Sequence, residues 1–159
     1  MSRIVIDGTA ITASEGANLL TVARENGIPI PGLCFHDRIS ATGACRLCIT
    51  KIDGRKDLVM ACTVSVYDGM EITAFDDELE DVRRHTLDYL LAEHNDQYDG
   101  TYTDEFRELV VRYGLDDPGN RRYPTITHDV EYKVDDSSPV LTYDASKCIK
   151  CFRCIKACD

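Results

Sequence analysis

The sequence contains no long uninterrupted apolar run and has few basic residues. No apolar stretch approaches the roughly 20 residues that a membrane-spanning helix needs. The first residues, Met1 to Gly8, lack the apolar region and cleavage site of a secretory signal. We therefore expect a cytoplasmic protein. With 18 basic and 28 acidic residues the formal charge is −10, which disfavours binding to nucleic acid or to acidic membranes.

Common catalytic and nucleotide-binding patterns are also missing. The chain has no Ser/His/Asp arrangement, no paired carboxylates in a supporting context, and no glycine-rich dinucleotide or phosphate-binding loop. We therefore expect no catalytic site within the 159 residues, and no binding of NAD or flavin by this chain alone. The composition, 43% hydrophobic and 29% charged, still fits a folded protein with a modest core.

Residue patterns in the first half predict a small mixed α/β fold. Strands are expected at 4–6, 10–12, 47–52, 56–60 and 71–75. Asp7-Gly8 lies between the first two strands and is a two-residue hairpin signal. A helix is expected over 18–25, with Asn18 as its N-cap. The order of hairpin, helix and returning strands favours a β-grasp sheet within an α+β fold.

The second half is expected to be more helical. The patterns predict a helix over 77–94, a helix over 104–113, a connecting segment over 115–139 and a short strand at 140–143. Asp77 is expected to cap the first of these helices, with Glu80 completing a capping box. Glu80 is also four residues before Arg84, a favourable ion-pair spacing.

The eight cysteines are the most informative residues. In a chain without a secretion signal, they are better interpreted as metal ligands than as disulfides. The first set is Cys34, Cys45, Cys48 and Cys62, with 10, 2 and 13 residues between successive members. A 2Fe–2S cluster needs two thiolates on each iron, which a close pair and two distant cysteines can supply. Gly43 would let backbone approach the cluster closely, and the charge of Arg46 could offset that of the cluster.

The sequence around this first set resembles one iron–sulfur family. The family comprises the large iron–sulfur subunit of respiratory complex I, iron-only hydrogenases and the α subunits of NAD-linked formate dehydrogenases. The resemblance depends on 30–36, 42–48 and 60–62, and it covers nearly the whole chain. It implies a β-grasp, ferredoxin-like 2Fe–2S domain over 1–76, a helical and linker segment over 77–139, and the first half of a 4Fe–4S ferredoxin-type domain over 140–159.

Zinc is the main alternative for these cysteines. A structural zinc ion takes four thiolates, usually from two Cys-x2-Cys pairs. Cys34 and Cys62 are each isolated, which makes zinc the weaker interpretation. His36 could also be considered as a ligand, but four thiolates suffice, and we expect His36 to hydrogen-bond its neighbours in the loop.

A second cluster site of the family is degenerate in this chain. In the family, a histidine after the long helix begins a His-x3-Cys-x2-Cys-x5-Cys motif that binds a 4Fe–4S cluster. His94 is retained here, but the matching cysteine positions are Tyr98, Thr101 and Arg107. One imidazole cannot hold such a cluster without thiolates, so we expect no cluster there and expect His94 to be a surface or helix-end residue.

The chain ends in a second cysteine set. Cys148, Cys151, Cys154 and Cys158 form a Cys-x2-Cys-x2-Cys-x3-Cys run, typical of 4Fe–4S ferredoxins. In two-cluster ferredoxins the first three bind one cluster and the fourth binds its neighbour. The other ligands would then come from residues beyond Asp159 or from a partner, and we expect the chain to be part of a longer polypeptide. The site could also be empty in this chain alone.

Basic residues surround the C-terminal cysteines in an otherwise acidic chain. They are Lys147, Lys150, Arg153 and Lys156. They could neutralise the charge of a cluster, mark a docking surface, or be solvated side chains on a short helix, and the sequence does not rank these alternatives.

These features together predict an iron–sulfur electron-transfer module of a multi-subunit oxidoreductase. The resemblance points first to the N-terminal part of a NAD-linked formate dehydrogenase α subunit, with a flavin-containing diaphorase subunit and a later catalytic domain as partners. The alternatives are the same module in a hydrogenase or a complex I-like enzyme, a zinc-stabilised interaction module, and a free-standing ferredoxin.

Overall fold

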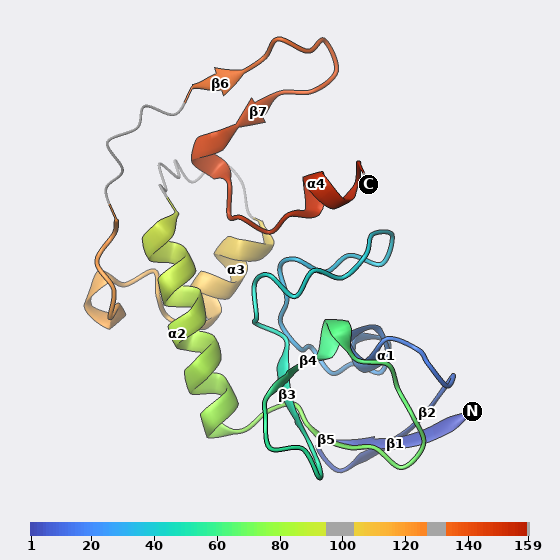
Figure 1. Cartoon of the computed structure of the whole chain (residues 1–159). Coiled ribbons are helices and arrows are strands. Elements are labelled where there is room, and N and C mark those ends of the chain that lie inside the picture. Colours follow the sequence, from blue (N-terminus) through green and yellow to red (C-terminus); the bar gives the residue numbers. More distant parts are fainter. Residues whose placement is uncertain (95–103, 127–132, 159) are drawn as a thin grey trace. The chain divides into compact units, whose positions relative to one another are not determined.

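The computed structural model describes residues 1–94, 104–126 and 133–158, shown in Figure 1. The chain divides into two compact units. The first consists of residues 1–83 together with the C-terminal segment from Cys151, and the second consists of residues 84–150. The helix α2 (Asp77–Glu93) runs through the boundary. The domain boundaries expected at 76 and 139 stay predictions.

The first unit contains a five-stranded mixed sheet. Its strands are β1 (Ser2–Ile6), β2 (Thr9–Ala13), β3 (Ile49–Ile52), β4 (Val59–Met60) and β5 (Glu71–Thr73), in the spatial order β2-β1-β5-β3-β4. The neighbours β1 and β5 are parallel, and the other pairs are antiparallel. Asp7 and Gly8 have φ angles of 47° and 78°, as a tight hairpin turn requires, which confirms the predicted hairpin.

Three strands are shorter than the sequence predicts, and in two of them other groups bind the backbone where the strand ends. β5 ends at Thr73, since the N–H groups of Ala74 and Phe75 donate to Asp7 Oδ1 at 2.8 and 3.4 Å. β3 starts at Ile49 rather than at residue 47, since the Leu47 carbonyl accepts a hydrogen bond from a side chain of α2. β4 is reduced to two residues.

Helix α1 (Leu19–Glu25) packs its apolar face into the core of the first unit. Asn18 caps it as predicted, with Oδ1 accepting from the N–H groups of Leu20 and Thr21 at 3.0 and 3.2 Å. The core also includes Cys48 and Cys62, so part of the first cysteine set lies in the hydrophobic interior. Burial of the apolar helix face against the strands therefore also determines where these two thiols lie.

Helix α2 begins at the predicted residue 77, but its N-cap differs by one residue from the prediction. Asp76, not Asp77, is the N-cap, because its Oδ1 accepts from the Leu79 N–H at 2.8 Å. The other carboxylate oxygen of Asp76 accepts from Lys51 Nζ at 2.6 Å, a contact from β3 that fixes its position. The predicted capping by Asp77 is wrong, because Asp77 is already the first residue of the helix. Glu80 forms its ion pair with Arg83, three residues on, instead of with Arg84.

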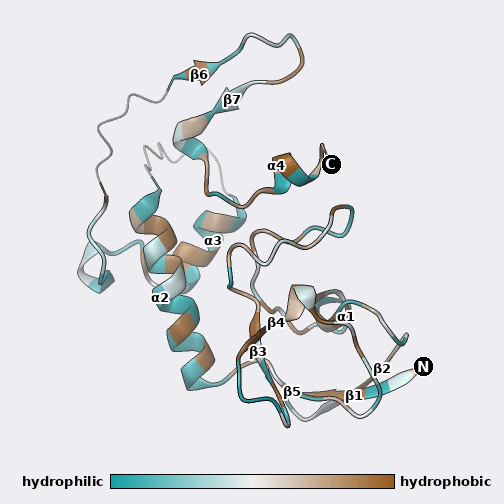
Figure 2. Cartoon of the chain, in the orientation of Figure 1, coloured by the Kyte–Doolittle hydropathy of each residue, from teal (hydrophilic) through white to brown (hydrophobic). Residues whose placement is uncertain are grey.

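The second unit begins with the last turns of α2 and includes α3 (Glu105–Arg112), which confirms the second predicted helix. Asp104 caps α3, with Oδ1 accepting from the Arg107 N–H at 2.7 Å. Figure 2 shows hydrophobic and hydrophilic residues alternating along α2. Asp88 of α2 is 2% exposed and accepts hydrogen bonds from the following loop. These come from the Arg122 N–H at 2.6 Å, the Tyr123 N–H at 3.2 Å and Arg121 Nε at 3.3 Å.

The strand expected at 140–143 is wrong in position. The described strand is β7 (Tyr143–Asp144), and it pairs with β6 (Val134–Asp135), inside the segment predicted to be a connection. Between them, the N–H groups of Ser137 and Val140 bind the side chains of Asp135 and Ser138. Those local bonds compete with strand pairing. Part of the connecting segment, 127–132, lies outside the described residues.

In the three ranges that the structure describes, none of the helices combines the length and the apolarity needed to cross a lipid bilayer.

Candidate functional site

Four buried cysteines of the first unit come from three separate segments. One lies in the loop between α1 and β3, two lie directly before β3, and one lies in the short 3-10 helix η1 (Ala61–Thr63). They are Cys34, Cys45, Cys48 and Cys62, which are 1%, 5%, 1% and 1% exposed. All four are free thiols.

The four thiols contact one another. The Cys34 thiol hydrogen-bonds those of Cys45 and Cys62, and the Cys62 thiol also hydrogen-bonds that of Cys48. The contacts thus run in the order Cys45, Cys34, Cys62, Cys48. The structure therefore brings together all four members of the set that the sequence analysis singled out, although up to 13 residues separate neighbours along the chain.

The contacts divide the thiols into two kinds. Hydrogen bonds from Cys45 and then Cys62 lower the pKa of Cys34, and a hydrogen bond from Cys62 lowers the pKa of Cys48. The pKa values of Cys45 and Cys62 are raised, first by their bonds to Cys34 and further by burial. These hydrogen bonds favour the thiolate form at Cys34 and Cys48 and the protonated form at Cys45 and Cys62. A metal centre that binds all four as thiolates would displace those protons.

Backbone N–H groups also point at the sulfur atoms. The Leu33 N–H donates to Cys45 Sγ at 3.3 Å, and the Leu47 N–H is a second donor to the same thiol. A backbone hydrogen bond at Cys62 also lowers the pKa of the Cys48 thiol. Such donors favour the charged form of a thiol and stabilise negative charge on a metal-bound sulfur.

The loop that carries the close pair adopts left-handed backbone at two positions. Gly43 has φ +63°, and a Cβ at this position would lie 3.0 Å from Met60 Sδ. Only glycine fits there without displacing the neighbour, which supports the close backbone approach expected at Gly43. Arg46 has φ +55° and is exposed in the turn between Cys45 and Cys48. The turn therefore directs both thiols inward and leaves the Arg46 side chain at the surface.

The thiols follow one another in a row of contacts. Within residues 1–94, 104–126 and 133–158, no three His, Cys, Asp or Glu side chains are placed to hold one metal ion. The row has Cys45 and Cys34 at one end and Cys62 and Cys48 at the other, with the Cys34–Cys62 contact between them. Two thiolates on each of two irons is the requirement of a 2Fe–2S cluster. The donor set, four soft and buried thiols with N–H donors, therefore fits that group.

The histidines behave as the sequence predicts. His36 is exposed, and its Nδ1 accepts from the Arg38 N–H at 3.2 Å, so it bonds its own loop. His94 follows the last helical residue of α2, and its ring lies edge-on to that of Phe106 at 5.3 Å. Arg107, one of the three positions that lack a cysteine, lies in α3. The other two, Tyr98 and Thr101, lie outside the described residues.

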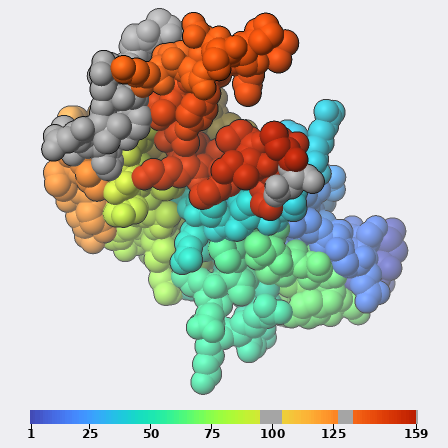
Figure 3. Space-filling view, turned by 45° about the horizontal axis from the view of Figure 1, so that its top comes forward, coloured from blue at the N-terminus to red at the C-terminus, as the bar shows by residue number. Residues whose placement is uncertain are grey.

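The C-terminal cysteines are more exposed than the first set. Cys151 is half-buried, and Cys148, Cys154 and Cys158 are exposed. Cys148 belongs to the second unit and the other three to the first, so their common ligand role stays a prediction. Within the first unit, Arg153 Nη2 donates to the Phe35 carbonyl at 2.9 Å. The described C-terminal residues around Arg153, coloured red in Figure 3, thereby lie on the surface of this unit beside the segment after Cys34.

The sequence analysis missed two side-chain contacts with the segments that carry the cysteines. Asn18 Nδ2 donates to the Cys62 carbonyl at 2.7 Å, in addition to capping α1. Arg83 donates to the Leu47 carbonyl between Cys45 and Cys48. A signal for Arg83 was present, because it stands four residues from the buried Leu79 and four from the buried Leu87, on the apolar face of α2.

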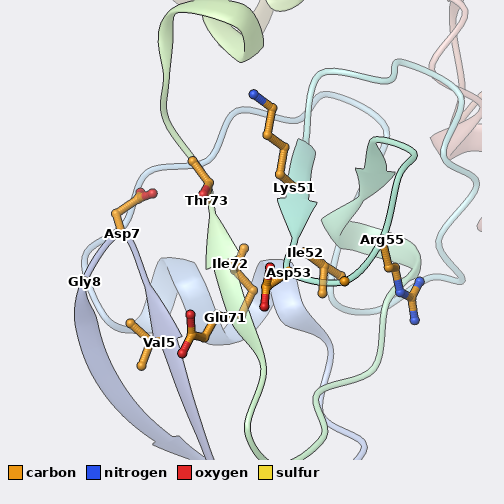
Figure 4. A pocket seen from close by; sticks show the side chains of 11 residues that line it. Val5, Asp7, Gly8, Lys51, Ile52, Asp53, Arg55, Glu71, Ile72 and Thr73 are labelled. Carbon is orange, nitrogen blue, oxygen red and sulfur yellow. The ribbon is translucent and has the colours of Figure 1, made fainter.

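A separate hollow lies against β1, β5 and β3 and contains no cysteine. Figure 4 shows acidic and basic side chains around it, and the Lys51 side chain extends away from its centre. The Lys51 ammonium is already bound by Asp76 and Glu78, each at 2.6 Å. Side chains of both charge signs line the hollow, among them Asp53 and Arg55. This mixture of charges does not favour any one class of ligand.

Comparison with known proteins agrees with this site. Residues 1–76 match the family model described as the 2Fe–2S iron–sulfur cluster binding domain. The chain is 34% identical to the gamma subunit of the NAD-reducing hydrogenase HoxS of Cupriavidus necator, over 97% of this chain and 64% of that protein. It is 30% identical to a component of the NADH-quinone oxidoreductase of Rhizobium meliloti, over 100% of this chain and 19% of that protein.

A solved structure shows the same fold. The crystal structure of a NAD+-reducing [NiFe]-hydrogenase in the H2-reduced state matches with a TM-score of 0.82 and 27% identity, over 98% of this chain and 65% of that chain. Iron hydrogenase 1 of Clostridium pasteurianum and a Bacillus subtilis protein provisionally named a formate dehydrogenase also match over nearly the whole length of this chain. The chain spans from about one sixth to about two thirds of the length of these relatives.

Proposed function

We propose that this chain, whose residues 1–76 belong to the 2Fe–2S iron–sulfur cluster binding domain family, is an electron-transfer module of a multi-subunit oxidoreductase. The observation that carries the proposal is the convergence of four buried thiols, at positions 34, 45, 48 and 62, in direct mutual contact. The relatives with the same module are parts of hydrogenases and NADH-linked oxidoreductases, which supports a redox role.

In this proposal each residue of the site has a defined task. Cys34 and Cys45, at one end of the row of thiol contacts, would hold one iron, and Cys48 and Cys62, at the other end, would hold the second. When bound, a 2Fe–2S cluster supplies reversible one-electron transfer. The Leu33 N–H lowers the cost of negative charge on Cys45 Sγ. Burial of all four sulfur-bearing residues excludes water and sets the local dielectric.

We propose a second centre at the C-terminal run. Cys148, Cys151 and Cys154 would hold three corners of a 4Fe–4S cluster, with further ligands from a longer polypeptide or a partner, and Cys158 would serve a neighbouring cluster. The bond from Arg153 to the Phe35 carbonyl supports a short route between the two centres, because Phe35 follows Cys34 directly. We propose a reducing, cytoplasmic location for the protein, because thiols that serve as metal ligands persist in such a compartment.

The enzyme that uses the module is a further proposal. We propose a flavin-containing, NAD-linked diaphorase subunit as one partner and a catalytic domain or subunit as the other. Formate dehydrogenase is the terminal enzyme that the resemblance favours first. A NAD-reducing hydrogenase is the second candidate, and it is supported by the 34% identity that extends over 64% of the HoxS gamma chain.

Anaerobic purification with metal analysis tests the central proposal. We expect a red-brown protein with equal amounts of iron and acid-labile sulfide, and an EPR signal of a 2Fe–2S centre after reduction with dithionite. Cys45→Ser and Cys62→Ser should each lose this signal, while Cys154→Ser, outside the buried set, should keep it. A colourless wild-type protein that contains one zinc and no sulfide would contradict the proposal and favour a zinc-stabilised interaction module.

A further inference from the structure

Arg83 is completely buried, at 0% exposure, in the first unit. Its guanidinium donates to three backbone carbonyls: Nε to Leu47 at 3.0 Å, and Nη2 to Ile49 at 2.6 Å and Ala74 at 2.7 Å. Nη1 binds the carboxylate of Glu80, and the guanidinium carbon lies 4.9 Å from the centre of the Phe75 ring. Arg83 therefore joins α2 to the backbone on both sides of Cys48.

The charge of Arg83 is only partly balanced in the interior. Its three carbonyl partners carry partial charges, and its one anionic partner, Glu80, has a side chain that is 37% exposed and so is screened by solvent. A guanidinium remains protonated at any pH relevant to proteins. A positive charge in a medium of low dielectric constant acts strongly on nearby charges.

The Arg83 contact reaches the thiols through one peptide group. The peptide between Leu47 and Cys48 has its carbonyl on Arg83 Nε, so the guanidinium holds the backbone directly before Cys48. The next residue, Ile49, is held by the same guanidinium through its carbonyl. The orientation of the backbone on both sides of Cys48, and hence the position of its thiol, depends on the guanidinium.

We propose that Arg83 is a positioning residue for the 2Fe–2S centre, which fixes the Cys45–Cys48 turn and raises the reduction potential through its buried charge. The inference rests on the proposed function. Reduction of such a centre adds one electron and one unit of negative charge, with no bond formed or broken and no proton required. A nearby buried cation stabilises the more negative, reduced form.

The test is a redox titration of the loaded, full-length protein with mediators under anaerobic conditions, read by visible absorption and EPR. Arg83→Met keeps the length of the side chain and removes the charge and the donors. We expect the equilibrium between reduced and oxidised centre to shift at least tenfold toward the oxidised form, which is about 59 mV for a one-electron couple. Arg84→Met, an exposed neighbour in the same helix, is the matched control and should leave the potential unchanged.

Arg83→Lys separates charge from hydrogen bonding. Lysine keeps the charge but cannot span three carbonyls with a planar fork. We expect Arg83→Lys to retain most of the potential and to alter the EPR line shape, because the peptide before Cys48 is held less firmly. A merely structural role would move neither the potential nor the line shape in protein that retains its cluster.

Glu80→Gln keeps the proposal testable if Arg83→Met loses its cluster. This variant removes the negative partner of Arg83 while leaving the buried arginine in place, so it should raise the potential. A potential in Arg83→Met equal to that of the wild type and of Arg84→Met would overturn the inference, as would an unchanged or lower potential in Glu80→Gln. Absence of a 2Fe–2S spectrum in the wild type would instead overturn the proposed function itself.

Discussion

Replacing Asn18 with aspartate should separate helix capping from support of the cluster site. In the native protein Asn18 Oδ1 caps α1 through two N–H groups, while Nδ2 donates to the Cys62 carbonyl at 2.7 Å. Aspartate keeps an equally good capping oxygen and loses the donor. Asn18→Ala loses both. Comparison of the two variants therefore measures each contribution separately.

The magnitudes follow from these contacts. Loss of an N-cap costs about 1 kcal/mol, within a range of about 0.5–2. Loss of the Nδ2 bond leaves the Cys62 carbonyl without this partner in a part-buried position, at a cost of about 1–3 kcal/mol. We therefore expect a loss of about 1–3 kcal/mol for Asn18→Asp, and about 1 kcal/mol more for Asn18→Ala. Against a typical domain stability of about 5–15 kcal/mol, both variants should fold.

Two measurements check this prediction under anaerobic conditions: the urea midpoint by far-UV circular dichroism, and the rate at which a chelator removes iron. Asn26→Asp is the matched control, because Asn26 Nδ2 donates to the Val22 carbonyl at the other end of α1, away from Cys62. We expect faster iron release in Asn18→Asp than in Asn26→Asp. Equal release rates in the two variants would refute the view that Asn18 supports the Cys62 segment.

Three further predictions concern single residues. Gly43→Ala should destabilise the protein by about 1–2 kcal/mol and lower cluster occupancy, since φ is +63° and the new Cβ meets Met60 Sδ. Gly54→Ala is the control: its φ is +77° but the space around it is open, so it should lower stability and leave cluster occupancy unchanged. Urea unfolding measures the stability of both variants, and iron analysis measures their cluster occupancy. Asp88→Ala should cost about 2–4 kcal/mol in urea unfolding, because two backbone N–H groups and Arg121 Nε lose a buried acceptor. Cys151→Ser in the intact complex should remove a 4Fe–4S EPR signal and keep the 2Fe–2S signal; retention of both would contradict the ligand role of Cys151.

Local patterns predicted the helices well. Asn18 and Asp104 mark helix starts that the structure confirms, because an N-cap interacts with groups only two or three residues away. The N-cap of α2 was missed by one residue for a nonlocal reason. Asp76 and Asp77 are equivalent in a local pattern, and the contact of Asp76 with Lys51 on β3 distinguishes them. Strand ends were predicted less well. The Asp7 side chain binds the backbone after β5, and a side chain of α2 binds the backbone before β3, so the hydrogen bonding between strands stops there.

The candidate site was partly visible in the sequence. Spacing alone brought out Cys34, Cys45, Cys48 and Cys62 as a set, because thiolates are strong and uncommon ligands whose arrangement around a cluster constrains the loop. The order of the contacts among their thiols was not visible in the sequence. It depends on where the loop before β3 and the 3-10 helix η1 meet in the folded first unit.

The sequence by itself determined the identity of the thiols, the N-cap of α1 and the residue types in the loop, because these depend on chemistry within a few positions. The tertiary structure alone decided that Arg83, 36 residues after Leu47, holds the backbone beside Cys48. It also decided that the Asn18 side chain reaches the Cys62 carbonyl, 44 residues away. Such contacts depend on how α1 and α2 pack against the sheet, and burial of an apolar face sets that packing without specifying a polar partner in advance.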